Sequence, residues 1–288
     1  MIDPRPKPLV WITGASGVIG NYLATTAPRF AQQWQVRALT HEQLDLLDFA
    51  AVRREFQRDQ PQLVIHCAAL TVVAEAEKDP ALARRINVEA TRVLAELAAA
   101  IPFVFFSTDI VFDGRKGNYT ETDGVNPIHV YGETKAAAEQ IILNNPRHLV
   151  VRTSINGGVS RAGRAFNEQL RRALRQPDQM MKLFTDEFRC PIPAVETARA
   201  VWDLVNQNRA GLFHIAGAEK LSRWQIGLLL VQRWPEVTAK LEPNSAKNFR
   251  GPRRALDTSL DISKAQNTLS HPLPRFSDWL AAHPHEPF

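Results

Sequence analysis

The 288-residue sequence has few cysteines, few glycines and no long apolar run, and each shortage excludes a class of protein. Its two cysteines, Cys67 and Cys190, lie far apart with no further Cys or His at metal-ligand spacing. A disulfide framework is therefore excluded, and we predict no metal site. The most apolar stretches, such as 226–231, are too short to span a bilayer. Residues 1–7 contain no apolar signal core, so we expect a cytoplasmic protein without membrane contact.

The composition is that of an ordinary globular protein. Hydrophobic residues make up 44% of the chain and charged residues 23%, which excludes disordered, collagen-like and coiled-coil proteins. The net charge is +5, from 35 Lys and Arg against 30 Asp and Glu. This mild excess suits a ligand that carries phosphate, whereas the absence of a long Lys/Arg run argues against a nucleic-acid partner.

Short β-rich runs alternate with longer helical patterns along most of the chain. The expected strands are 9–13, 35–40, 63–67, 103–107, 148–153 and 212–216. The expected helices between them are 18–27, 49–58, 81–100, 131–143 and 195–206. Most of the strands are continuous apolar runs, as expected for parallel strands covered on both faces. The alternation predicts an α/β fold with a Rossmann-type, doubly wound parallel sheet.

Two segments interrupt this alternation. The first has one amphipathic helix near 164–175, and the second has helices near 223–234 and 276–282 around a loop rich in Pro and Arg. We predict that 1–155 and 194–220 form an NAD(P)-binding Rossmann domain, and that 156–193 and 221–288 form a smaller, discontinuous C-terminal lobe for the substrate. Ligands of such sheets bind at the carboxyl edge of the strands.

A glycine-rich turn follows the first expected strand. Residues 13–20 read TGASGVIG, with the spacing G-x-x-G-x-x-G. Gly14 permits a tight turn, Gly17 lets the backbone approach a pyrophosphate, and Gly20 lets the helix pack closely on the strand. The helix N-terminus then presents free N–H groups to the phosphates. A strand-to-helix turn without a ligand has the same spacing, but the chain has only 14 glycines to place. We therefore predict nucleotide binding here.

A tyrosine and a lysine lie four residues apart in the helix expected at 131–143. This spacing puts Tyr131 and Lys135 on one helical face. A lysine charge near a phenol favours the phenolate, and a phenol tuned in this way can protonate a carbonyl oxygen as hydride arrives at the carbon. Tyr and Lys four residues apart are common by chance. This pair indicates a catalytic function only because the glycine turn precedes it.

The glycine turn and the Tyr131–Lys135 pair together resemble the short-chain dehydrogenase/reductase superfamily. In that superfamily, and especially in its extended branch, the second residue of a Ser-Thr pair after the fourth strand holds the substrate carbonyl. The resemblance assigns this role to Thr108, with Ser107 as a support, and assigns Asn87 to the proton-relay water. Without the resemblance, Thr108 would equally be a helix cap and Asn87 a surface residue.

A longer series of motifs resembles the dTDP-4-dehydrorhamnose reductase family. The motifs are HCAALT at 66–71, STDIVFDG at 107–114, ETD at 121–123, VYGETK at 130–135, RTS at 152–154 and the segment 254–261. The resemblance covers 9 to about 265. It implies an oxidoreductase that reduces the 4-keto group of a nucleotide-linked 6-deoxy sugar with NADPH or NADH.

The resemblance also implies which residues bind the cofactor and the substrate. The end of the second strand, Leu39-Thr40-His41, lacks the acidic residue that would bind a ribose 2′-hydroxyl, so NADP is preferred over NAD. The substrate contacts are Thr108, Asp109, Ile155 and Arg254, the last as a guanidinium for diphosphate. The cofactor contacts are Gly14, Ser16, Gly17, Val18, Ile19, Gly20, Thr40, Asp45, Leu46, Ala68, Ala69, Leu70, Thr71, Tyr131 and Lys135.

Departures from the family pattern leave the individual sugar open. Ile155 stands where the family often has Trp, and Ala74 where it often has Asp. A sugar-nucleotide dehydratase is disfavoured, since Ile110 after Asp109 removes the second acid of its acidic pair, whereas an epimerase needs no such pair and stays open. A non-catalytic NADP-binding subunit also stays open, because the beta subunit of methionine adenosyltransferase resembles this same family. The sequence does not decide whether the chain forms a homodimer.

Overall fold

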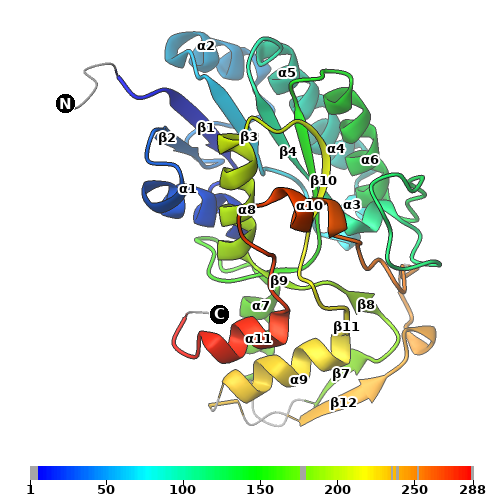
Figure 1. Ribbon diagram of the computed structural model, residues 1–288. Coiled ribbons are helices and arrows are strands. Elements are labelled where there is room, and N and C mark those ends of the chain that lie inside the picture. Colours follow the sequence, from blue (N-terminus) through cyan, green and yellow to red (C-terminus); the bar gives the residue numbers. More distant parts are fainter. Residues whose placement is uncertain (1–5, 176–179, 235, 238–239, 252, 287–288) are drawn as a thin grey trace.

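The computed structural model describes residues 6–175, 180–234, 236–237, 240–251 and 253–286. Its centre is a six-stranded sheet in the order β10-β5-β4-β3-β1-β2 (Figure 1). Every neighbouring pair of strands in it is parallel. The strands are β1 (Leu9–Thr13), β2 (Gln35–Leu39), β3 (Leu63–His66), β4 (Phe103–Thr108), β5 (Leu149–Thr153) and β10 (Gly211–Ile215). This order confirms the predicted Rossmann-type fold.

The apolar runs of the sequence become strands because helices cover both faces of the sheet. Every residue of β3, β4 and β5 is buried. In β1, Val10 and Ile12 join the core on one face and Trp11 joins the core on the other. α1 (Val18–Phe30) and α8 (Ala194–Asn206) pack into the first core, and α2 (Phe49–Asp59), α5 (Ala90–Leu97) and α6 (Val130–Leu143) into the second.

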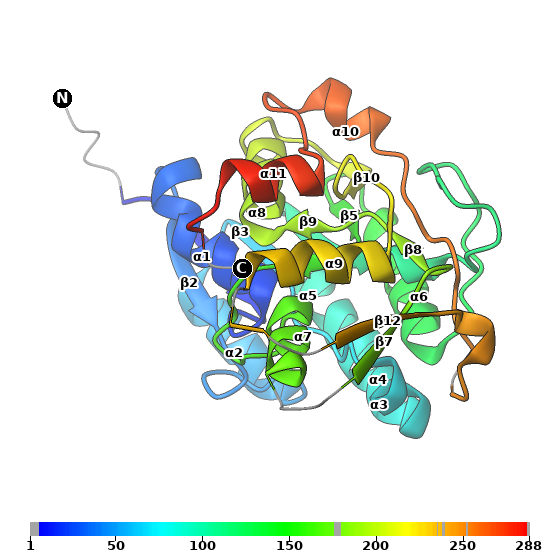
Figure 2. The ribbon, with the colours of Figure 1, turned by 90° about the horizontal axis from the view of Figure 1, so that it is seen from below.

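Elements from the two interrupting segments form a smaller layer below the carboxyl edge of the sheet (Figures 1 and 2). β7 (Met180–Phe184) pairs with β12 (Lys240–Asn244). α7 (Phe166–Leu174), α9 (Arg223–Arg233) and α11 (Phe276–Ala282) share a separate apolar core. Two short pairs, β6 (Asn156–Gly157) with β9 (Ile192–Pro193) and β8 (Phe188–Arg189) with β11 (Leu221–Ser222), connect this layer to the sheet.

The largest local difference from the sequence prediction is the helix expected at 81–100. It consists of α4 (Pro80–Arg84), a π-helical turn at Arg85–Glu89, and α5. The prediction also missed the short elements α3 (Val73–Lys78), β7, β12 and α10 (Ser263–Thr268), which are too short to show a clear period. None of the helices in the described ranges is long and apolar enough to cross a membrane.

Candidate active site

The glycine turn between β1 and α1 has room for nothing larger than glycine at two of its positions. Gly14 has a φ of +67°, and a Cβ there would lie 2.6 Å from the backbone nitrogen of Ala68. A Cβ on Gly20 would lie 2.5 Å from the carbonyl oxygen of Gly14. Gly17 caps α1 without a side-chain hydrogen bond, so the first N–H groups of α1, at Val18 and Ile19, have no capping side chain. This cradle fits a pyrophosphate.

The predicted cofactor residues after β2 are held by their own loop. The side-chain oxygen of Gln43 accepts hydrogen bonds from the N–H (2.9 Å) and the hydroxyl (3.1 Å) of Thr40. The Asp45 carboxylate accepts a hydrogen bond from the N–H of Leu47 at 2.9 Å. Leu46 packs against the core on the α2 side. Thr40 therefore remains a neutral strand end, as the sequence predicted.

The structure brings Thr108, at the end of β4, together with Tyr131, in the first turn of α6. Both side chains are buried, with 8% of each residue exposed. A hydrogen bond with the Thr108 side chain acts to lower the pKa of the Tyr131 phenol, but burial and the Asp109 charge outweigh it and raise this pKa. The sequence argument expected the Lys135 charge to lower the Tyr131 pKa, whereas the net shift of this pKa is upward. Burial, which the sequence does not reveal, dominates.

Lys135 lies one turn further along α6, with its ammonium 3.9 Å from the centre of the Phe105 ring. Burial lowers the pKa of Lys135 to about 7. Within the described ranges it has no hydrogen bond and no ion pair. The Ser107 hydroxyl, on the same face of β4 as Phe105, is likewise buried without a partner. A buried cation and a buried hydroxyl without partners, together with the glycine cradle, fit a dinucleotide that supplies oxygen ligands to both.

Asn87 lies in the π-helical turn and does not face an open space. Its side chain donates to the carbonyl of Leu70 (3.1 Å) and to the Thr134 hydroxyl (2.9 Å), and it accepts from the N–H of Leu70 (2.8 Å). Its own carbonyl accepts the Thr91 hydroxyl. These contacts fix the Asn87 side chain, and its predicted role at a proton-relay water stays a prediction. The side chain connects α6 to the predicted cofactor loop 68–71, in which the N–H of Ala68 also lies 3.4 Å from the Thr13 hydroxyl.

Asp109 follows Thr108 and connects the sheet to the lower layer. One of its oxygens accepts hydrogen bonds from Ser154, after β5, and from Thr258, both at 2.8 Å, and lies 3.5 Å from the Arg189 guanidinium. The other lies 3.2 Å from the Thr108 hydroxyl. The carboxylate therefore anchors the end of β4. Ile155, next along the chain from Ser154, is half-buried beside the core of the lower layer.

Three arginines surround Glu187, a cluster that the sequence analysis did not find. Arg254 donates two hydrogen bonds to the fully buried carboxylate, Arg223 donates one at 2.9 Å, and Arg189 lies 3.2 Å away. The guanidinium groups lower the pKa of Glu187 to about 2 against the opposing effect of burial. Arg189 also contacts Asp109. The three guanidinium groups therefore face two carboxylates, Glu187 and Asp109, and the cluster has a net charge of +1.

Two aromatic rings complete the surroundings of Arg254. Its guanidinium lies 5.0 Å from the centre of the Phe184 ring and 5.2 Å from that of Phe249. Phe249 is 40% exposed. Arg250 and Arg253, which precede Arg254 in the chain, are exposed.

His129, just before α6, is a further residue that the sequence analysis missed. It is 8% exposed, and its ring has no hydrogen bond with the described residues. Burial lowers its pKa, and the charges that act on it are Glu77 of α3 and the cluster of Arg254, Arg189 and Glu187. His129 therefore stands as a neutral imidazole between α6 and the arginine cluster. Only its place before the Tyr131 motif could have suggested it.

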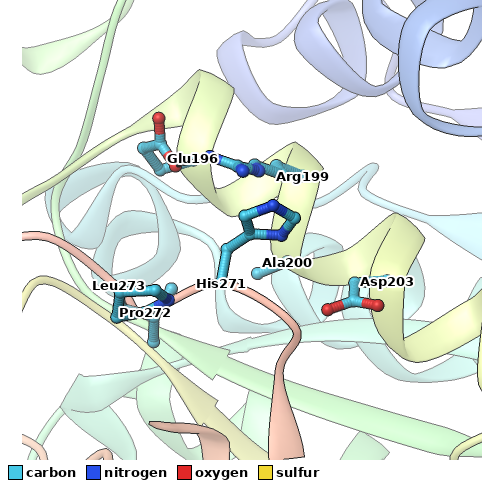
Figure 3. A pocket seen from close by; sticks show the side chains of 7 residues that line it. All are labelled: Glu196, Arg199, Ala200, Asp203, His271, Pro272 and Leu273. Atoms are coloured by element: carbon cyan, nitrogen blue, oxygen red, sulfur yellow. Dashed lines mark ion pairs between the residues drawn. The ribbon is translucent and has the colours of Figure 1, made fainter.

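The cavity drawn in Figure 3 is not part of this site. It lies between α8 and residues 271–273, and it is lined by Glu196, Arg199, Ala200, Asp203, His271, Pro272 and Leu273. Its volume of about 10 Å³ holds at most one water molecule. The described residues contain no group of three or more side chains that could hold a metal ion.

The parallel sheet, the glycine turn and the buried Thr108–Tyr131–Lys135 group define an oxidoreductase fold of the short-chain dehydrogenase/reductase class. The sequence pattern described as RmlD substrate binding domain matches residues 9–285. The chain belongs to this family.

Several relatives match almost the whole chain. A dTDP-4-dehydrorhamnose reductase of Mycolicibacterium smegmatis is 32% identical, over 94% of this chain and 82% of its own length. One from Sinorhizobium fredii is 28% identical over 93% of both chains. Methionine adenosyltransferase 2 subunit beta of Bos taurus is also 28% identical, over 91% of this chain and 82% of its own.

Two solved structures share the fold. The crystal structure of a dTDP-4-dehydrorhamnose reductase from Clostridium acetobutylicum superposes with a TM-score of 0.86 at 26% identity, covering 95% of this chain and 97% of its own. A second, from Bacillus anthracis in complex with NADP, has a TM-score of 0.88 at 24% identity and covers 96% and 98%.

Proposed function

We propose that this protein is an NAD(P)H-dependent reductase that converts the 4-keto group of a nucleotide-linked 6-deoxy sugar to an alcohol. The observation that carries the proposal is the burial of Thr108 and Tyr131 together, with the Thr108 side chain acting on the Tyr131 phenol, at the sheet edge where the glycine turn and Lys135 also lie. Family membership and the names of the relatives agree with it.

The residues of this chain then have distinct roles. Gly14, Gly17 and Gly20 receive the pyrophosphate of the nucleotide, and Lys135 holds a ribose hydroxyl. The bound nicotinamide supplies the hydride. Tyr131 donates its proton to the carbonyl oxygen as the hydride reaches the carbon, which leaves an alcohol and a phenolate. The phenolate then takes a proton from solvent.

The substrate occupies the space between the sheet edge and the lower layer. Thr108 holds the sugar carbonyl, and Ile155 forms part of the wall around the sugar. The residual positive charge of the Glu187 cluster, with Arg254 half-exposed, receives the diphosphate. In this proposal 1–155 and 194–220 bind the nucleotide, and 156–193 and 221–288 bind the substrate.

The test is turnover on a panel of nucleotide-linked 4-keto sugars with NADPH or NADH, followed by loss of nicotinamide absorbance. A reductase consumes one nicotinamide per sugar. An epimerase changes the sugar without net consumption of nicotinamide. This outcome would contradict the proposed reductase and favour an epimerase.

The second candidate is a non-catalytic NADP-binding subunit, favoured by the methionine adenosyltransferase beta subunits, which are as similar as the Sinorhizobium reductase. Binding of NADPH without turnover of any sugar in the panel would support it. Cytoplasmic localisation stays a prediction, and the choice between monomer and homodimer is to be measured on the same preparation.

A further inference from the structure

The chain that leaves β5 passes beside the glycine turn before it enters α7. We call residues 158–163 the strap. The N–H of Ala162 donates to the carbonyl of Ser16 at 3.1 Å, and the side chain of Asn21 in α1 donates to the carbonyl of Val159 at 3.1 Å. Gly158 has a φ of +150°, and a Cβ there would lie 2.6 Å from the Tyr22 ring. The strap therefore lies against the N-terminal half of α1.

Contacts with α7 fix the strap from its other side. Asn167 accepts from the N–H of Gly158 and donates to its carbonyl, both at 3.0 Å. The Ser160 hydroxyl donates to Glu168 at 2.6 Å. Protein contacts alone thus hold the strap in place beside the turn.

The strap touches the turn at Ser16, next to Ala15. The N–H of Ala15 donates to the carbonyl of Leu39, so Ser16 lies between the start of α1 and the end of β2. In doubly wound folds the ribose 2′ position is read at the end of β2.

At the end of β2, the basic side chains of the described residues already face carboxylates, and His41 lies 3.7 Å from Asp45. The residues after Leu39 are Thr40, His41 and Glu42. The nearest guanidinium of β2, Arg37, is bound by Glu55 and Asp59.

Arg161 is the exposed cation of the strap next to the contact with Ser16. It directly precedes Ala162, its side chain is exposed, and it forms no hydrogen bond or ion pair with the described residues. We propose that Arg161 binds the 2′-phosphate of NADP(H), so that the preference for NADPH over NADH comes from the strap and not from β2. This inference rests on the proposed function, because it takes the glycine turn as the nucleotide site.

The experiment measures dissociation constants of NADPH and NADH by calorimetry, without substrate, for the wild type and Arg161→Ala. We expect NADPH to bind about 10-fold more weakly to R161A, the loss typical of one charge-assisted hydrogen bond, and NADH to bind unchanged. Arg161→Lys, which keeps the charge, should recover part of the loss. Arg29→Ala removes the same charge at the far end of α1 and should change neither constant.

The other outcomes overturn the inference in distinguishable ways. If R161A bound NADPH and NADH more weakly to the same extent, Arg161 would contact the pyrophosphate that both share. If neither dissociation constant changed, Arg161 would be a surface residue without a role in binding. If the wild type bound neither nucleotide, the proposed function would fail together with the inference.

Discussion

Tyr131 combines two features of a proton donor, namely a buried phenol and a hydroxyl partner in Thr108. Tyr131→Phe removes one oxygen and keeps the ring, so folding and nucleotide binding should persist. Loss of the proton donor should lower kcat by about 10²–10⁴-fold. The measurement is steady-state kinetics with a nucleotide-linked keto sugar.

The control for this prediction is Tyr119→Phe. Tyr119 donates its hydroxyl to Asp113 and stacks on Phe112. This variant should lower the melting temperature and leave kcat within a few-fold of the wild type. A wild-type kcat in Tyr131→Phe would show that Tyr131 is not the proton donor.

Lys135 makes stability depend on pH in a known direction. Burial lowers its pKa to about 7 from an ordinary value near 10.5. Between these values the unfolded chain holds a proton that the folded protein has lost, so the free energy of unfolding rises with pH across this window. Lys135→Met removes the contribution. In urea denaturation, the free energy of unfolding of K135M should exceed that of the wild type most at about pH 6 and almost not at all at about pH 10.

The same variant should also weaken NADPH, because the ammonium is then missing from the cofactor site. A stability difference between wild type and K135M that stays constant with pH would contradict the shifted pKa. A constant difference would leave the cofactor role of Lys135 to be judged by the nucleotide dissociation constant alone.

At the scale of elements, the β1–α1 turn depends on a backbone that only glycine adopts easily. Gly14→Ala places a methyl group 2.6 Å from the Ala68 nitrogen at a φ of +67°. We expect a loss of about 1–3 kcal/mol of stability together with loss of NADPH binding, measured by thermal unfolding and calorimetry. Gly124→Ala is the matched control, since a Cβ there meets nothing within 4 Å. Equal effects of both variants would refute the crowding argument.

The central sheet and the order of its elements could be predicted from the sequence. All six predicted strands exist, with bounds that differ by at most one residue at either end, because fully covered parallel strands are apolar throughout. The glycine turn and the Tyr131–Lys135 helix were also predictable, because their spacing along the chain fixes their spacing in space.

The rest of the site depends on contacts between segments far apart in sequence. Glu187, Arg223 and Arg254 meet only after the lower layer has packed, so no local pattern reveals them. The π-helical turn around Asn87 shows the same limit. Periodicity predicted one continuous α-helix. The π-helical turn instead places Asn87 where it forms hydrogen bonds with Leu70 and Thr134, which are distant in sequence.

At the scale of the whole molecule, the sheet and the lower layer meet at charged groups close to Thr108. Arg254→Ala removes a cation from the Glu187 cluster. Because one excess positive charge is then lost, KM for a diphosphate-linked substrate should rise about tenfold, as for loss of a charged hydrogen bond, while the NADPH dissociation constant stays unchanged. Kinetics and calorimetry measure the two quantities separately.

Arg253→Ala is the control, because Arg253 is an exposed neighbour with the same charge. High salt should reduce the difference between wild type and R254A, since a partly exposed guanidinium is screened. An unchanged KM in R254A would assign this arginine to structure alone.

The parallel arrangement of the sheet also determines how the protein is best attached to a surface. All strands of the sheet direct their carboxyl ends, and with them the site, towards the lower layer, whereas the chain enters β1 from the opposite edge (Figure 1). The C-terminal segment lies in the lower layer, where Arg233 donates to the carbonyls of Leu280 and His283. A tether at the N-terminus therefore leaves the carboxyl edge of the sheet turned outward on a biosensor chip, whereas a C-terminal tether pulls on the lower layer itself.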